Sequence, residues 1–121
     1  MNFFPARVEG SPAAADTGFA RIPLNGQAPR ALGKDVIVGV RPEDIHDLAR
    51  DSQEGRLPVE ARVEVVEYLG NELQLHLSAA DRAFVARVST DTRTQPGATM
   101  RVGFDLRKVH LFDQATEEAI R

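Results

Sequence analysis

The chain has 121 residues, which is enough for one domain with a core of its own. A hydrophobic fraction of 42% and a charged fraction of 27% are typical of a soluble globular protein and exclude a disordered chain. The net charge of -3 gives no electrostatic reason to expect nucleic-acid binding, because phosphate recognition needs a basic face. The absence of cysteine excludes disulfides and thiolate metal sites and fits a reducing compartment.

The apolar runs are only a few residues long, far short of the ~20 that span a bilayer. The N-terminus does not show the basic and then apolar pattern of a secretory signal. We therefore expect a soluble cytoplasmic protein.

The first part of the chain is irregular. Asn2 to Val8 is compatible with a strand, which Pro5 would confine to a sheet edge or a bulge. Residues 10–18 and 23–34 are rich in Gly, Pro and Ala and predict loops, with a short strand from Phe19 to Ile22 between them.

The clearest early element is a strand from Asp35 to Arg41, whose two faces are both apolar and are expected to be covered. Pro42 then suits the first position of a helix, and acidic Glu43 and Asp44 suit its first turn. The spacing of Ile45, Leu48 and Ala49 predicts a helix of about two turns that packs these side chains inward. The alternative is that Arg41 and Glu43 contact a ligand or partner, and Arg41 is the residue that local mechanics leave unexplained.

Apolar residues alternate with polar ones from Val59 to Tyr68, which predicts a half-buried strand. The phase slips near Val65–Val66, so we expect a β-bulge there, which bends a strand as barrel closure requires. Gly70-Asn71 predicts a tight turn with a positive φ.

Three further strands are predicted, separated by polar turns, and each has a set of apolar side chains that face inward. These side chains are Leu73, Leu75 and Leu77 in the first strand, Phe84, Ala86 and Val88 in the second, and Met100, Val102, Phe104 and Leu106 in the third. Val109 and Leu111 predict a last short strand. The predicted fold is mainly β: a small OB-like barrel with additional N-terminal strands and one short helix. We expect a single domain, with N-terminal strands, loops and helix over 1–56, a five-strand barrel core over 57–113, and a C-terminal tail over 114–121.

Few residues are candidates for chemistry. His46, His76 and His110 lack the local spacing of metal ligands, with the first in the expected helix and the others on strands. The serines at strand ends, Ser78 and Ser89, have no evident base. Glu60, Glu64 and Glu67 predict a solvated face, and the phenylalanines fit a core better than a base-stacking platform.

Four segments occur in an order and spacing that resemble one protein family. They are Met1-Asn2-Phe3-Phe4 with Gly10 soon after, Gly39-Val40-Arg41-Pro42-Glu43, Val66-Glu67-Tyr68-Leu69-Gly70-Asn71-Glu72, and His110-Leu111-Phe112-Asp113. Together they resemble the C-terminal regulatory region, the TOBE domain, of ATP-binding subunits of carbohydrate ABC importers of the maltose and glycerol-3-phosphate types. The resemblance covers essentially the whole chain.

The resemblance implies an OB-like barrel, a place at the inner face of the membrane, and a homodimer formed partly through these regions. It also implies contacts with the ATPase domain of the parent chain, indirectly with membrane permease subunits, and with a cytosolic regulator.

The ATPase half of that family is missing from the sequence. No phosphate-binding loop is present, and Gly33-Lys34 lacks both the earlier glycine and the following hydroxyl residue. We therefore expect no catalysis and no cofactor in this chain, with ATP and Mg held by the absent ATPase domain. Met1 is then either a natural start or an internal methionine of a longer gene, and the sequence leaves both open.

The sequence predicts a non-catalytic regulatory and dimerisation domain, with a small-ligand module for an oxyanion or sugar effector as the alternative. Backbone N–H groups at Gly70-Asn71 or at the helix start after Arg41 could hold an anion. The residues expected to contact a partner are Gly39, Arg41, Pro42, Glu43, Gly70, Asn71, Glu72, His110, Phe112 and Asp113.

Overall fold

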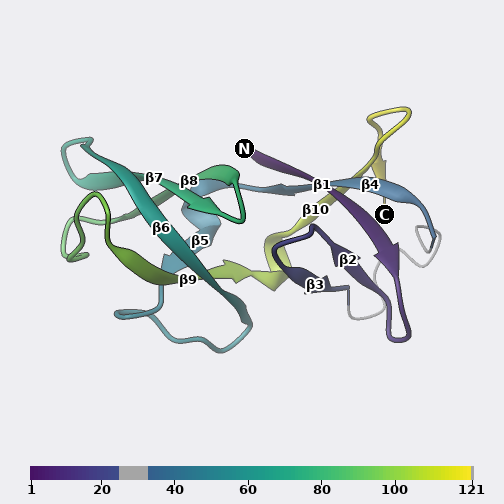
Figure 1. The fold of residues 1–121 in the computed structure, drawn as a ribbon, viewed down its shortest axis with the longest axis horizontal. Coiled ribbons are helices and arrows are strands. Elements are labelled where there is room, and N and C mark those ends of the chain that lie inside the picture. The colour runs from purple at the N-terminus through teal and green to yellow at the C-terminus, as the bar shows by residue number, and fades with distance from the viewer. Residues whose placement is uncertain (25–32, 121) are drawn as a thin grey trace. The chain divides into compact units, whose positions relative to one another are not determined.

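The structure is a computed structural model that describes residues 1–24 and 33–120. The chain forms two compact units, each built on an antiparallel β-sheet (Figure 1). Unit 1 comprises Met1–Val40 and Leu106–Arg121, and unit 2 comprises Arg41–Asp105. The predicted mainly β, OB-like fold class is confirmed.

Unit 1 contains a six-stranded sheet in the order β11-β10-β4-β1-β2-β3. Its strands are β1 (Asn2–Glu9), β2 (Ala14–Asp16), β3 (Arg21–Pro23), β4 (Asp35–Val40), β10 (His110–Asp113) and β11 (Ala119–Ile120). The 3-10 helix η3 (Leu106–Lys108) precedes β10. Most of the predicted 23–34 loop, residues 25–32, lies outside the described residues.

The strands of unit 1 alternate between a buried and an exposed face. Phe4, Ala6 and Val8 of β1 are buried, as are the alternate valines of β4. Pro5 lies opposite Ile37 of β4, whereas β1 pairs with β2 only over Arg7–Glu9. At Pro5, strand β1 therefore has a partner strand on one side only, which is the edge position that the sequence predicts for this proline.

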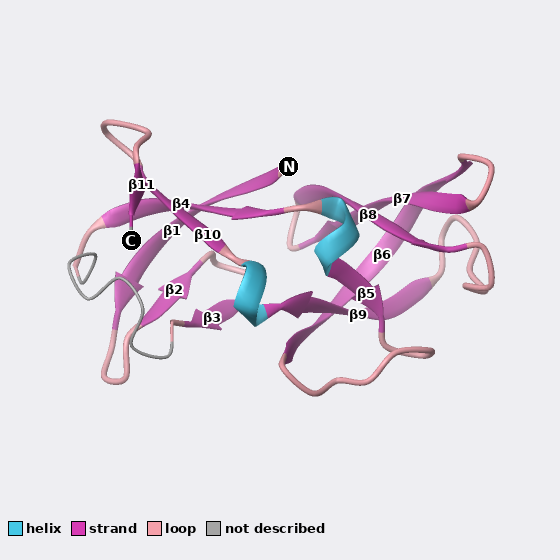
Figure 2. Cartoon of the chain, turned by 180° about the vertical axis from the view of Figure 1, so that it is seen from behind, coloured by secondary structure: helices cyan, strands magenta, loops and turns pink. Residues whose placement is uncertain are grey.

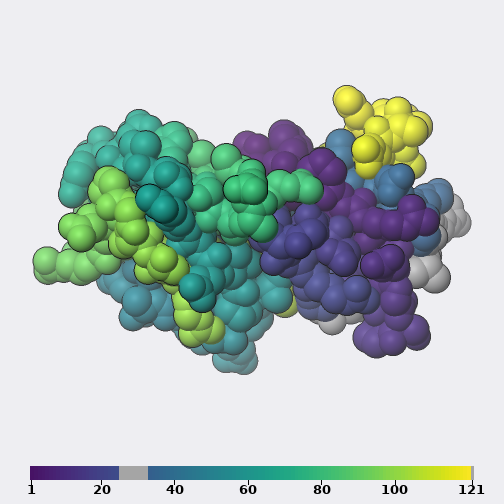
Figure 3. Space-filling model, viewed as in Figure 1, coloured from purple at the N-terminus to yellow at the C-terminus, as the bar shows by residue number. Residues whose placement is uncertain are grey.

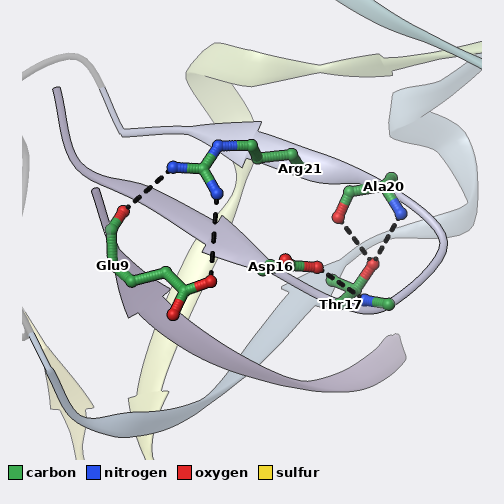
Figure 4. A network of polar contacts seen from close by, with 6 residues as sticks. Glu9, Asp16, Thr17, Ala20 and Arg21 are labelled. Carbon is green, nitrogen blue, oxygen red and sulfur yellow. Dashed lines mark hydrogen bonds and ion pairs between the residues drawn. The ribbon is translucent and has the colours of Figure 1, made fainter. Parts of the chain in front are cut away.

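The connection from β2 to β3 is fixed by side chains that bond to the backbone (Figure 4). The Thr17 hydroxyl donates to the Ala20 carbonyl at 2.9 Å and accepts the Ala20 N–H at 3.1 Å. Asp16 accepts the N–H of Gly18, and Arg21 donates to the carbonyl of Glu9 at 3.3 Å. These bonds fold residues 14–23 into a hairpin, although the sequence predicts a loop over 10–18.

Unit 2 contains a five-stranded sheet in the order β5-β9-β6-β7-β8. Its strands are β5 (Ile45–Asp47), β6 (Arg56–Tyr68), β7 (Glu72–Ala79), β8 (Arg82–Ser89) and β9 (Thr99–Asp105), and the 3-10 helix η2 (Pro42–Asp44) precedes β5. Figure 2 shows the helical turns in cyan among the strands. The inward side chains of all five strands form the core of the unit, including Phe84 and Phe104, whose ring centroids are 5.6 Å apart.

The predicted bulge and turn in unit 2 are confirmed. The register between β6 and β7 shifts between Val63 and Val65, so Glu64 is the additional residue. Gly70 has a φ of 81° in the turn between these strands, while Asn71 has no positive φ. Glycine in the first central position is typical of the type II′ turn, whose twist matches paired strands.

The predicted two-turn helix is wrong. Only the 3-10 helix η2 forms, and Ile45–Asp47 continues as strand β5, paired with β9. Ile45 is buried as expected, but Leu48 is half-buried and Ala49 is exposed. The second inward residue of the strand is Asp47. Because this inward residue is charged, the sequence of β5 does not show the alternation of apolar and polar residues that is typical of a strand.

The predicted fifth barrel strand is also wrong in its pairing. Strand β10 pairs with β4 and β11 in unit 1, and β5 takes the fifth place in the sheet of unit 2. The C-terminal residues also contribute a strand, because Leu111 and Phe112 pair with Ile120 and Ala119. The division into 1–56, 57–113 and 114–121 stays a prediction.

A buried hydrogen bond spans the gap between the two outer strands of unit 2. Strands β5 and β8 form no ladder with each other, so the sheet leaves a seam there. Asp47 on β5 is 4% exposed and Thr92, just after β8, is 6% exposed. The Thr92 hydroxyl donates to Asp47 Oδ2 at 3.0 Å, and the Ala49 N–H donates to Oδ1 at 3.0 Å. Both carboxylate oxygens are therefore satisfied across the seam.

We predict that Thr92→Val destabilises the protein by about 1–3 kcal/mol, because it leaves one oxygen of a buried carboxylate without a donor. Thr90→Val, at an exposed position nearby, is the matched control and should change little. Urea unfolding followed by circular dichroism measures both variants. Equal free energies of unfolding for the two would contradict the role of the bond.

Candidate functional site

The ten predicted contact residues fall into two sets. Gly39, His110, Phe112 and Asp113 belong to unit 1, and the other six belong to unit 2. The structure therefore provides two candidate surfaces, one in each unit.

The first surface is the outer face of the unit 1 sheet, which we define by Met1, Phe3, Pro5, Ile37 and Phe112. Phe3 is 59% exposed and Met1 is 45% exposed, while Ile37 and Phe112 are half-buried. The register aligns Pro5 with Ile37 and Ile37 with Phe112, so these side chains share one face. The rings of Phe3 and Phe112 meet edge to face with centroids 6.1 Å apart.

The elements that form this outer face lie far apart in the chain. In Figure 3, atoms of β1 (purple), β4 (blue) and the C-terminal hairpin (yellow) all reach the surface of unit 1. The opposite face of the same strands carries the buried core. A sheet with apolar side chains on both faces, one of them uncovered among the described residues, has a surface suited to a partner.

Gly39 creates the space in which the outer face assembles. A Cβ atom built there would lie 2.6 Å from Met1 Sδ and 3.0 Å from Phe112 Cε2. Gly39 also lies opposite both Phe3 and His110 in the ladder. Because Gly39 has no side chain, Met1 and Phe112 can pack against its backbone.

Asp113 has a structural role in the C-terminal hairpin. Its carboxylate accepts the N–H of Ala115 at 2.8 Å and of Thr116 at 3.1 Å. The bonds from Thr116 and Ala115, with a smaller effect of Lys34, lower the pKa of Asp113 below its usual value. His110 is exposed beside Gly39.

The Arg41-Pro42-Glu43 segment has the backbone that the sequence predicts. Arg41 is extended, with φ -75° and ψ 145°, and its carbonyl accepts the N–H of Asp44 at 2.9 Å. The Arg41 side chain is exposed and has no bonding partner among the described residues. The helical turn that follows has three residues, too few for an anion site at a helix start.

The second surface is a hollow of about 320 Å³ over the seam between β5 and β8. Three of the predicted residues line it together: Glu43, Asn71 and Glu72. Arg50 and Arg87 also line it. These three residues therefore lie together although their segments are far apart in the chain, and their role as contact residues stays a prediction.

Charges in the seam hollow are mixed. The acidic residues that line it are Glu43, Asp47, Asp51 and Glu72, and the basic ones include Arg50 and Arg87. Asp51 Oδ2 lies 3.5 Å from His46 Nδ1, and Arg50 lies 3.5 Å from Asp91. The side chains of Glu43, Asn71, Glu72 and Arg87 have no bonding partner among the described residues.

The other chemistry candidates have ordinary surface roles. His76 contacts Glu67 across the β6–β7 ladder, and Ser78 donates to Glu64 at 2.9 Å. Ser89 accepts the N–H of Asp91. Within residues 1–24 and 33–120, no group of three His, Asp or Glu side chains is placed to hold a metal ion.

Sequence reasoning missed several residues of both surfaces. Ile37 on the outer face, and Arg50 and Arg87 at the hollow, were not singled out. The register of β4 between β1 and β10 would have revealed Ile37. The arginines give no local signal, because only the pairing of the strands brings them to the seam.

Comparison with known proteins decides the family. The model of the TOBE domain matches residues 38–112, more than half of the chain. The chain belongs to the TOBE domain family. A second model, the MalK OB fold domain, matches residues 1–45. The predicted family is confirmed.

Similar curated proteins are ATP-binding proteins of transport systems. The sulfoquinovosyl glycerol transport ATP-binding protein SmoE of Agrobacterium fabrum is 40% identical over 99% of this chain and 33% of its own length. The trehalose/maltose import ATP-binding protein MalK of Thermococcus litoralis is 40% identical over 74% of this chain and 25% of its own. The oligosaccharides import ATP-binding protein MsmX of Bacillus subtilis is 38% identical over 74% of this chain and 25% of its own. The TOBE chain thus spans a third or less of these relatives.

In the part of the chain that the structure describes, no helix is long and apolar enough to cross a bilayer.

Proposed function

We propose that this TOBE chain is the non-catalytic regulatory and dimerisation region of the ATP-binding subunit of a sugar ABC importer. The observation that carries the proposal is the apolar outer face of unit 1, which combines residues of three of the four family segments: Met1 and Phe3, Gly39, and Phe112. The names of the relatives, which are ATP-binding proteins of sugar transport, support the transport context.

The outer face has the make-up of a protein interface. It contains two aromatic rings, those of Phe3 and Phe112, and a methionine, and such residues are enriched in interfaces. At one end of the same face, Arg7 and Asp35 form an exposed ion pair at 3.2 Å. An apolar stretch with an ion pair at one end suits a second copy, which would present the same face across a two-fold axis.

The rest of the proposal follows the family. The ATPase domain of the parent chain would hold ATP and Mg, and this region would need no cofactor of its own. The parent subunit would work with membrane permease subunits at the cytoplasmic face of the membrane. The outer face would also be accessible to a cytosolic regulator whenever the second copy of the chain does not cover it.

We predict that replacing both rings of the outer face, Phe3→Ser with Phe112→Ser, weakens self-association of the chain at least tenfold, because burial of two aromatic side chains is lost. Sedimentation velocity over a concentration series measures it. Tyr68→Ser, an exposed aromatic position in unit 2, is the matched control. A wild-type chain that stays monomeric at high concentration would contradict pairing, and so would equal effects of both changes.

A second candidate function is the binding of a small polar effector in the seam hollow. Four side chains that face the hollow are without partners, and its volume is at the lower end of small-molecule sites. Four acidic residues, Glu43, Asp47, Asp51 and Glu72, line the hollow and would repel an oxyanion there. A neutral sugar can instead donate hydroxyl protons to carboxylates and accept bonds from guanidinium groups.

We predict that titration calorimetry detects weak binding of a neutral sugar and no binding of molybdate, sulfate or phosphate. Glu72→Gln with Arg87→Gln should abolish the sugar signal, because both remove charged bonding groups from the hollow. Arg62→Gln, exposed and outside the hollow, is the control. Silence across a panel of sugars would exclude this candidate while leaving the regulatory role untouched.

A further inference from the structure

Strand β6 has an open edge at its C-terminal end. It pairs with β9 only over Arg56–Arg62, and Val63 bonds to the loop at Gly97 and Ala98. Beyond the bulge at Glu64, the strand continues to Tyr68 with β7 as its one partner in the described part of the chain. An uncovered edge of this kind is a template for another strand.

The phase of the ladder shows which backbone groups are free. Leu69 donates its N–H to the carbonyl of Glu72 at 2.8 Å, so this pair is hydrogen-bonded and the bonding alternates back along β6. Glu67 therefore bonds to β7, whereas Val66 and Tyr68 direct their N–H and C=O groups away from it. No bond to those groups of Val66 and Tyr68 occurs among the described residues.

Apolar side chains gather at the same edge. Val65 is 47% exposed, Tyr68 is 77% exposed and Leu69 is 43% exposed. Tyr68 also lines a hollow of about 960 Å³ together with Leu48 and Met100. An added strand would therefore find apolar contacts on one face of the sheet and room for side chains on the other.

The charge at the edge selects the occupant. Glu67 lies between Val66 and Tyr68 and points to the same face as its partner His76. A second copy paired antiparallel about this point would place Glu67 opposite Glu67, and like charges directly opposite are destabilising. A strand with a basic residue at that position gains a cross-strand ion pair instead.

We propose that the β6 edge from Val65 to Leu69 is a docking site for an extended segment of another protein, with a basic residue between two apolar ones. The segment adds to the sheet as a further antiparallel strand and bonds to the N–H and C=O groups of Val66 and Tyr68. This site lies in unit 2 and is independent of the pairing proposed for unit 1.

The test uses the 121-residue chain and two blocked peptides, Ser-Val-Lys-Val-Ser and Ser-Val-Glu-Val-Ser. In amide spectra of the labelled chain, the lysine peptide should shift Val66 and Tyr68 most, and the glutamate peptide should bind several times more weakly. Val66→Pro removes the free N–H and leaves the bonds to β7 intact, so binding should fall about tenfold in a folded variant. Glu67→Lys should reverse the preference between the peptides, which gives a second readout if the proline variant does not fold.

Shifts that are largest at residues neither in 64–69, nor opposite them on β7, nor lining the hollow at Tyr68 would overturn the proposal. Equal binding of both peptides, or an unchanged preference in Glu67→Lys, would also overturn it. Self-association that Val66→Pro abolishes would also overturn it, because the occupant would then be a second copy.

Discussion

A buried hydrogen bond between Thr92 and Asp47 joins the two outer strands of the five-stranded sheet of unit 2 across its open side. The ladder joins β5 to β9 and β7 to β8, but no ladder joins β5 to β8. A buried carboxylate is stable only when its oxygens have donors, and both donors here lie in the loops that close the seam. Asp47 also organises the turn over residues 47–51. Its backbone carbonyl accepts the N–H groups of Arg50 and Asp51, and its carboxylate accepts the N–H of Ala49. Because side chains close the seam and no backbone ladder does, a hollow remains over it.

The two units use the strand period in different ways. In unit 1, strands β1, β4 and β10 carry apolar residues on both faces, so the core occupies one face and the Phe3–Phe112 pair the other. In unit 2, the bulge at Glu64 changes the phase of β6, so that the strand leaves the core and ends in an open edge. The first arrangement presents side chains to a partner, and the second presents backbone. The two units therefore offer different kinds of surface, one of side chains and one of backbone.

Much of the fold could be predicted from the sequence, because most strands have a clear period of two and their turns contain glycine or proline. The predicted positions of the bulge in β6 and of the turn at Gly70 agree with the structure to within one residue. Strand β5 was missed since its inward Asp47 is polar, and its partner Thr92 is 45 residues away. The place of β10 beside β4 was missed because pairing between distant strands leaves no local trace. The same holds for the site: Glu43, Asn71 and Glu72 were named, while Arg87 required the assembled seam.

The role of the outer face of unit 1 can be tested by nuclear magnetic resonance on an equal mixture of isotope-labelled and unlabelled chains. Intermolecular Overhauser contacts arise only between protons of different copies. Pairing through this face predicts contacts that involve the side chains of Phe3, Ile37 and Phe112. Contacts confined to other residues, or none in a concentrated sample, would contradict it.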